Sequence, residues 1–232
     1  MARNELDYFY IDGEYGGDQD WFTDWWMNVG GCAAETACEA SLYFLKYFGL
    51  PVAPELPDQM SRQDYIAFAG QMKPYLRPRM HGVNRLSLFT DGYGKYLSDL
   101  GADGITMDTL DGYAPWEEAF EAVQDQIDSG IPVSVLILRH RAGSMKEYVW
   151  HWFTLTGWED GPRGRRVKAV TYGEWEWLDF WTLWNTGYKE RGGLILYRLP
   201  EDAVYQPCPR AELEPLPSPD VGPVMKIGST VL

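Results

Sequence analysis

The sequence predicts an α+β fold, in which an N-terminal helical lobe packs on a C-terminal antiparallel β-sheet. Helical spacing of apolar residues prevails up to residue 130, whereas residues 131–199 consist of short β-branched and aromatic runs separated by turn residues. The chain has 232 residues, 45% of them hydrophobic, which is enough for one large domain with one substantial core. We therefore expect a single domain over residues 1–199 and a proline-rich tail over residues 200–232.

The clearest helix is expected at residues 32–48. Small and apolar residues recur there at spacings of three and four, and Gly49 and Pro51 follow directly, as at a helix end. Residues 5–31, before it, are rich in Gly, Asp and aromatics and indicate an ordered irregular segment with room for a short strand. The remaining helical part is residues 49–130, with helices expected at 61–75, 92–100 and 115–130.

The second half of the chain changes to the pattern of strands. We expect strands at 131–138, 150–158, 165–173 and 193–199, with a short amphipathic helix at 178–184. Seven of the fifteen prolines then lie in residues 200–223, which indicates an extended tail.

Charge and hydropathy restrict the classes of partner. The net charge of −14 disfavours binding to a phosphate backbone, so we expect no nucleic-acid partner. The N-terminus has no apolar core of signal-peptide length, and no apolar run reaches about 18 residues. We therefore expect no membrane segment and a cytoplasmic location, while the oligomeric state stays open.

Metal and nucleotide sites are not expected, and we predict no cofactor. No group of Cys and His has zinc spacing, and no glycine-rich loop matches a phosphate cradle. One acidic run departs from the spacing of a calcium loop and is interpreted as a solvated loop; its members are Asp12, Glu14, Asp18 and Asp20.

Cys32 is the leading candidate for chemistry. A thiol at a helix N-terminus meets the positive end of the helix dipole and unpaired N–H groups, and both lower its pKa. Gly30 and Gly31 leave room for a substrate backbone, and the Cys32 amide can face an oxyanion. Cys38 lies in the apolar stripe of the same helix and is expected to pack in the core, whereas Cys208 in the tail has no chemical context.

A nucleophilic cysteine needs a base, and the chain has three histidines. His81 lies in a Pro/Arg-rich loop, and His140 lies among arginines at the end of a strand. His151 opens the strand HWFTLTGW after a polar loop, so its imidazole can project from the sheet edge toward the helical lobe. His151 is therefore the predicted general base.

The order of these elements resembles a known family. The stretch GGCAAETACEASLYFLKYFG is similar to the nucleophile helix of papain-like cysteine peptidases, in particular the C39-like branch that includes bacteriocin-processing peptidases. The strands around WHWFTLTGWED resemble the C-terminal half of that family, and the resemblance covers most of residues 19–199. It implies a papain-like fold with Cys32 as nucleophile and His151 as general base.

Two positions depart from the pattern of the family. The family places an oxyanion-stabilising Gln one or two helical turns before the nucleophile, but Trp26 occupies the position six residues ahead of Cys32. Gln19 and Asn28 are the candidate amides, with Gln19 slightly preferred.

The family also places an Asp or Asn after the His strand to orient the imidazole. Here that place falls on Thr171 or Tyr172, with Glu174 just beyond. The Thr171 hydroxyl can accept the imidazole N–H weakly, and Glu174 is the better electrostatic partner if its turn points inward.

The sequence therefore predicts a cysteine peptidase or related amide hydrolase that forms a thioester on a peptide or other amide-containing substrate. A substrate groove is expected near Gly30, Gly31, Trp26 and Trp152. The alternative is a non-catalytic papain-like protein that binds a peptide or glycan in a groove lined by aromatics such as Trp21, Trp25, Trp26 and Trp152.

Overall fold

Short β-branched and aromatic segments in the second half of the chain form most of an antiparallel sheet, and one of its inner strands, Val133–Ile137, is buried along its whole length. The computed structural model describes residues 2–79 and 82–207, and seven strands form this sheet in the order β4-β9-β5-β6-β7-β8, with β1 paired to β6. These strands are β1 (Ala2–Glu5), β4 (Thr106–Asp111), β5 (Val133–Ile137), β6 (His151–Gly161), β7 (Gly164–Thr171), β8 (Glu174–Asp179) and β9 (Gly192–Arg198). Two shorter strands pair with each other, β2 (Tyr10–Ile11) and β3 (Glu14–Tyr15).

Strand β6 is the centre of the sheet. Its first half pairs with β5, so that His151 lies opposite Ile137, and its second half pairs with β1. Its other edge pairs with β7, with an irregularity in register between Leu155 and Gly157. The strand that carries His151 is thus held by three others.

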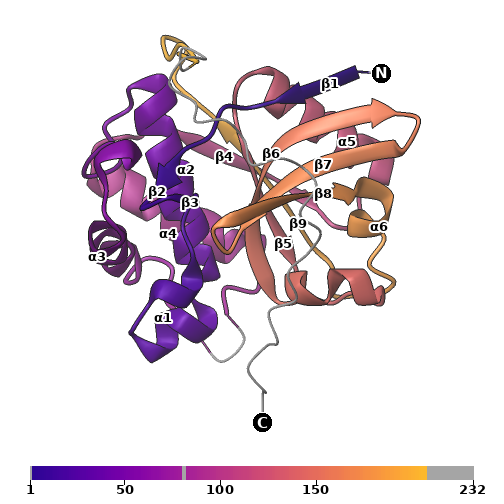
Figure 1. Cartoon of the computed structure of the whole chain (residues 1–232), viewed down its shortest axis with the longest axis horizontal. Helices are drawn as coiled ribbons and strands as arrows, with labels where there is room; N and C mark the ends of the chain where they lie inside the picture. Colours follow the sequence, from indigo (N-terminus) through magenta and orange to yellow (C-terminus); the bar gives the residue numbers. More distant parts are fainter. Residues whose placement is uncertain (1, 80–81, 208–232) are drawn as a thin grey trace.

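The helices surround this sheet. They are α1 (Trp25–Gly30), α2 (Cys32–Phe48), α3 (Arg62–Met72), α4 (Leu86–Asp99), α5 (Trp116–Asp128) and α6 (Phe180–Trp184), with the 3-10 turns η1 (Gln19–Trp21), η2 (Pro57–Gln59) and η3 (Gly143–Tyr148). Figure 1 shows α1 to α4 gathered at one side of the molecule and α5 and α6 at the other, beyond the sheet.

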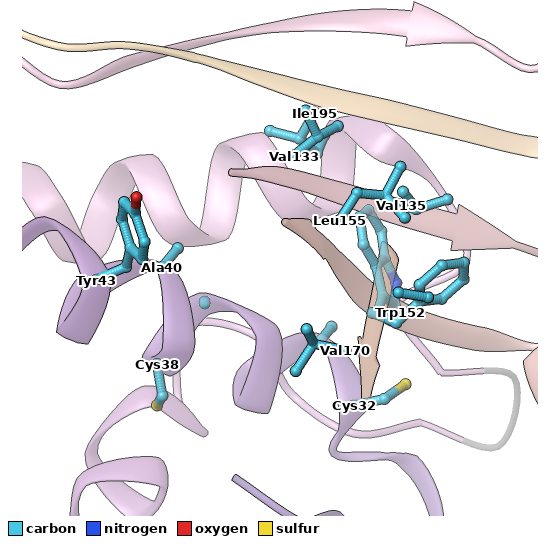
Figure 2. Packing of buried hydrophobic residues seen from close by; sticks show 14 of the residues in the cluster. Cys32, Cys38, Ala40, Tyr43, Val133, Val135, Trp152, Leu155, Val170 and Ile195 are labelled. Carbon is cyan, nitrogen blue, oxygen red and sulfur yellow. The ribbon is translucent and has the colours of Figure 1, made fainter. Parts of the chain in front are cut away.

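Helix α2 is the core helix. All its residues except Leu45 and Lys46 are buried, because it packs between α3 and strand β6. Figure 2 shows its side chains in one hydrophobic core with residues of β5, β6 and β9. The helix ends at Gly49, whose left-handed φ of 66° suits glycine at this position. The expected bounds of this helix, 32–48, are confirmed.

The α+β class with an antiparallel sheet is confirmed, but the expected assignment of elements is wrong at several places. Strand β4 lies inside the expected helical part, 49–130, and pairs with β9. Its mostly exposed sequence, TMDTLD, gives no apolar run, so only its partner strand reveals it.

Other boundaries also differ. Helix α4 begins six residues earlier than expected, because Gly92 and Gly94 obscure the helical pattern of the sequence. Strands β1 to β3 lie in or beside the segment expected to be irregular, and β8 takes the first residues of the helix expected at 178–184.

The beginning of the expected tail packs on the domain. Tyr205 contacts the rings of Tyr47 and Phe48, and the Gln206 N–H donates to the Tyr47 carbonyl at 2.7 Å. Residues 208–232, with Cys208, lie outside the described residues. Across residues 2–79 and 82–207, no helix is long and apolar enough to cross a bilayer.

Candidate active site

A single glycine places Cys32 at the start of α2. Gly31 ends α1 and begins α2, and its amide donates to the Met27 carbonyl at 2.8 Å. A Cβ on Gly31 would lie 2.3 Å from that carbonyl oxygen, so no other residue fits here without a shift of the backbone. No side chain caps the N-terminus of α2, so the N–H groups of its first turn, beside Cys32, donate to no capping side chain.

The Cys32 thiol is directed toward the sheet. The main chain of Trp152, the residue after His151, hydrogen-bonds to the thiol, and the charge of a Cys32 thiolate would act on Tyr172. Figure 2 shows Cys32 near Trp152, while Cys38 lies farther along the helix. The structure therefore brings the beginning of α2 to the beginning of β6.

Burial decides the protonation of this thiol. Cys32 is 4% exposed, and burial raises its pKa to about 11, opposed by main-chain hydrogen bonds and assisted by the charge of Glu35. The expectation of a lowered pKa is therefore wrong, because the desolvation of the thiolate outweighs the favourable N–H groups at the helix N-terminus. Cys32 rests as a neutral thiol.

His151 is held by Thr171. Its Nε2 lies 2.7 Å from the Thr171 hydroxyl, at the end of the neighbouring strand β7. Burial lowers the pKa of His151 to about 3, so the imidazole is neutral near pH 7. When Nε2–H donates to Thr171, Nδ1 carries the lone pair that a general base requires.

Tyr172 covers a face of the His151 ring, a role that its sequence position did not indicate. Its ring stacks on His151 with centroids 4.7 Å apart and planes 4° apart, and its hydroxyl lies 3.5 Å from Nδ1. Tyr172 is therefore the residue beside the basic nitrogen.

The backbone around this pair is strained. Tyr172 and Gly173 form the two-residue turn between β7 and β8 with φ values of 54° and 70°, a conformation that favours Asn and Gly. Trp150, just before His151, also has a positive φ, of 57°. Strain of this kind is concentrated at functional sites in proteins, so the φ values of this turn support a functional role for Tyr172 that the sequence did not indicate.

Glu174 does not reach the imidazole. It is an exposed residue of β8, and burial is the only cause of the lowered His151 pKa, so no carboxylate acts on the ring. The interpretation of Glu174 as an electrostatic partner is therefore wrong. The turn formed by Tyr172 and Gly173 stacks Tyr172 on the imidazole, and Glu174, the next residue, is exposed.

Gln19 and Asn28, the alternative oxyanion groups, are joined to each other. The Gln19 side-chain nitrogen donates to the Asn28 carbonyl at 2.6 Å, and the buried Gln19 Oε1 has no hydrogen-bond partner among the described residues. The Asn28 main chain thus fixes the Gln19 amide, while the Asn28 side chain remains half-buried on α1.

The expected groove residues separate into two groups. Trp152 is buried, stacks on Phe89 and donates its indole N–H to the Val83 carbonyl, and Trp21 is buried as well, so neither lines a groove. Trp25 and Trp26 are exposed. Trp26 lines a hollow of about 300 Å³, together with Lys73, Pro74, Arg77 and Pro78.

This hollow is next to the glycine pair, since a Cβ on Gly30 would lie 3.6 Å from Pro78. Of the other two histidines, His140 hydrogen-bonds to the Thr182 carbonyl, and His81 is outside the described residues.

Two arrangements are not found within the described parts of the chain. No hydrogen bond joins the Cys32 sulfur to His151, and no group of three or more Cys, His, Asp or Glu is placed to hold a metal ion. The comparisons with known proteins add no further guide. No family model matches the chain, and neither a search of curated proteins nor one of solved structures gives a match.

Proposed function

We propose that this protein is a papain-like cysteine hydrolase that acts on a peptide or related amide bond. The observation that carries the proposal is the convergence of α2 and β6, which brings the Cys32 thiol to the main chain of Trp152, next to His151. The hydrogen bond between His151 and Thr171 supports it, because a cysteine nucleophile needs an imidazole that is held in place and whose second nitrogen carries a lone pair.

The reaction begins from a neutral pair. His151 Nδ1 accepts the thiol proton as the Cys32 sulfur attacks the substrate carbonyl carbon, and the carbonyl oxygen becomes an oxyanion. The Cys32 amide and the Gln19 side chain stabilise this oxyanion. The intermediate then expels the amine, which takes the proton from His151, and leaves a thioester. Water, deprotonated by His151, attacks the thioester and releases the acid and the thiol.

This path does not require a resting thiolate. Since burial raises the pKa of Cys32 and lowers that of His151, proton transfer accompanies attack instead of preceding it. The Tyr172 hydroxyl lies beside Nδ1, so it must give way to the thiol in the reacting state.

Alkylation of the intact chain with iodoacetamide tests the proposal. We expect Cys32 to react faster than the buried Cys38, as measured by mass spectrometry of peptides from the folded protein. Between about pH 5 and pH 8 the Cys32 rate should show no step from ionisation of His151, because this imidazole stays neutral throughout the range.

The His151→Ala variant is the matched control. It should slow alkylation of Cys32 about tenfold or more and leave Cys38 unchanged, since general-base assistance contributes about 10²–10⁴-fold to reactions of this type. Equal rates for Cys32 and Cys38, or an unchanged Cys32 rate in His151→Ala, would contradict the proposal.

A non-catalytic binding protein is the second candidate. The exposed Trp26 in the lining of the hollow favours it, because exposed aromatics in a depression are typical of binding sites for peptides or glycans. If this candidate is correct, Trp26→Ala abolishes binding of a peptide or glycan while His151→Ala has no effect on binding or on alkylation.

A further inference from the structure

Helix α2 carries two buried carboxyl groups that the proposed reaction does not use. Glu35 and Glu39 are one helical turn apart, and they are only 4% and 3% exposed. No Lys, Arg or His side chain among the described residues forms an ion pair with either of them. Buried carboxyls are costly unless their oxygens are hydrogen-bonded, so their partners indicate what they hold in place.

Glu39 holds the loop before η1. One of its carboxyl oxygens accepts the Gly17 N–H at 2.9 Å, and the other accepts the Thr154 hydroxyl at 3.1 Å. The contact with the loop is close, because a Cβ on Gly16 would lie 2.5 Å from the same oxygen of Glu39. The carboxyl therefore joins the loop to strand β6.

The loop in turn holds the strained turn over His151. The Gly17 carbonyl accepts the Gly173 N–H at 2.8 Å, and the Gly173 carbonyl accepts the Tyr15 N–H at 2.8 Å. Both main-chain groups of Gly173 are therefore fixed by the segment that Glu39 anchors. Tyr172, the residue before Gly173, is the one stacked on His151.

We propose that Glu39 is a positioning residue that holds Tyr172 against His151 through Gly17 and Gly173. Loss of the Glu39 carboxylate loosens Gly17 and then the turn, and the Tyr172 ring leaves the imidazole. The consequence for catalysis rests on the proposed function, but the placement of Tyr172 does not.

Protonation is the natural way to alter this anchor. Burial raises the pKa of Glu39 to about 7, and burial together with the charge of Glu39 raises that of Glu35 well above its ordinary value. The gain or loss of the Glu39 proton therefore falls near neutral pH, and the raised pKa of Glu35 favours its protonated form. The other titratable groups that interact with Glu39 from the elements around it are Tyr8, Tyr15, Tyr65 and Cys38, all neutral in this range.

The ionised form is the stronger anchor. Both Glu39 oxygens accept hydrogen bonds, and a carboxylate accepts a main-chain N–H more strongly than a carboxylic acid does. The Gly17 anchor should accordingly strengthen as pH rises through about 7, and the stacking of Tyr172 on His151 should become more complete.

Nuclear magnetic resonance of the full chain, with labelled His and Tyr, tests this inference. The His151 ring protons lie under the Tyr172 ring, so their chemical shifts report the stacking. We expect these shifts to change with a midpoint near pH 7 in the wild type, well separated from the titration of His151 itself near pH 3. In Glu39→Gln this midpoint should vanish.

Glu35→Gln is the matched control, because it removes the other buried carboxyl of α2 without touching Gly17. In this variant the chemical shifts of the His151 ring protons should still report stacking under Tyr172, and their pH midpoint should stay near neutral pH. Unaltered His151 shifts and an unaltered midpoint in a folded Glu39→Gln variant would overturn the inference.

If Glu39→Gln does not fold, a measurement on the wild type tests the same inference. Hydrogen exchange of the Gly173 amide is measured at about pH 8.5 and about pH 5.5 and corrected for its intrinsic pH dependence. We expect about tenfold more protection at the higher pH, because the ionised Glu39 carboxylate then holds Gly17, whose carbonyl accepts the Gly173 N–H. Equal protection at both values would refute the role of Glu39. If Cys32 proves unreactive while these signals respond as expected, the proposed function fails and the positioning role stands.

Discussion

At the scale of single residues, burial shifts the pKa values of the candidate pair in opposite directions: it raises that of Cys32 and lowers that of His151. It disfavours the thiolate of Cys32 and the imidazolium of His151, so the neutral pair is the resting form. A weak neutral partner suffices for such an imidazole, since no positive charge has to be balanced before the reaction. The Thr171 hydroxyl, one of the candidate partners from the sequence, meets this requirement at 2.7 Å, whereas the Glu174 carboxylate was the stronger candidate.

Replacing Thr171 by Val tests this contact. Valine keeps the shape but leaves the buried Nε2 of His151 unsatisfied, so we expect a loss of about 1–2 kcal/mol in the free energy of unfolding. Assisted alkylation of Cys32 should slow about tenfold, because the ring is no longer fixed with Nδ1 free. Thr171→Ser, which retains the hydroxyl, should keep both near the wild-type values; a Val variant indistinguishable from Ser in urea unfolding and alkylation would refute the role.

At the scale of elements, α2 depends on a glycine at each end for different reasons. Gly49 adopts a left-handed φ of 66°, and a Cβ placed there would meet no atom within 4 Å, so its requirement is purely one of backbone conformation. Gly31 has an ordinary φ of −87°, but the Met27 carbonyl leaves no room for a side chain. The first glycine therefore fixes where the helix begins, and with it the place of Cys32.

Alanine at the two positions should separate these requirements. We expect Gly49→Ala to cost about 1 kcal/mol in the free energy of unfolding and to leave Cys32 alkylation unchanged. Gly31→Ala should cost more than Gly49→Ala and also change the Cys32 rate, because the start of α2 must shift away from Met27. Urea unfolding and alkylation of both variants measure this; equal costs and equal rates would contradict the explanation.

At the scale of the whole molecule, a buried lysine joins the N-terminal strand to the sheet. Lys168 of β7 has a side chain only 1% exposed, and it pairs with Glu5 of β1 and donates to the Tyr15 hydroxyl at 2.9 Å. Its ammonium also lies over the rings of Tyr15 and Trp175, at 4.6 and 4.4 Å. Burial lowers the pKa of Lys168, so this cation depends on its partners for its charge.

Removing the partner should therefore destabilise the whole domain. We expect Glu5→Gln to lower the free energy of unfolding by about 3 kcal/mol, because it leaves a buried ammonium without its carboxylate. Arg3→Ala is the control: Arg3 also pairs with Glu5, but its side chain is 44% exposed, and its loss should cost less than about 1 kcal/mol. Thermal and urea unfolding at about pH 7 measure both, and similar costs for the two would argue against a structural role for the buried pair.

Local pattern in the sequence was enough to predict one group of features. Helix α2, the four main strands, the position of Cys32 at a helix start and that of His151 at a strand start all follow from the spacing of apolar residues and from turn residues. Thr171 was among the candidates for another reason: the family resemblance places the residue that orients the imidazole at the end of the strand after that of His151.

A second group of features depends on what packs against each residue, and here the three-dimensional arrangement was required. The pKa directions of Cys32 and His151 follow from burial, and burial depends on segments far away in sequence. The exposed strand β4 is defined by its partner β9, and the contact of Tyr172 with His151 depends on a turn fixed by Gly17. A periodic pattern states which face of an element is apolar, but not which atoms meet that face, and the chemistry of this site is decided by those atoms.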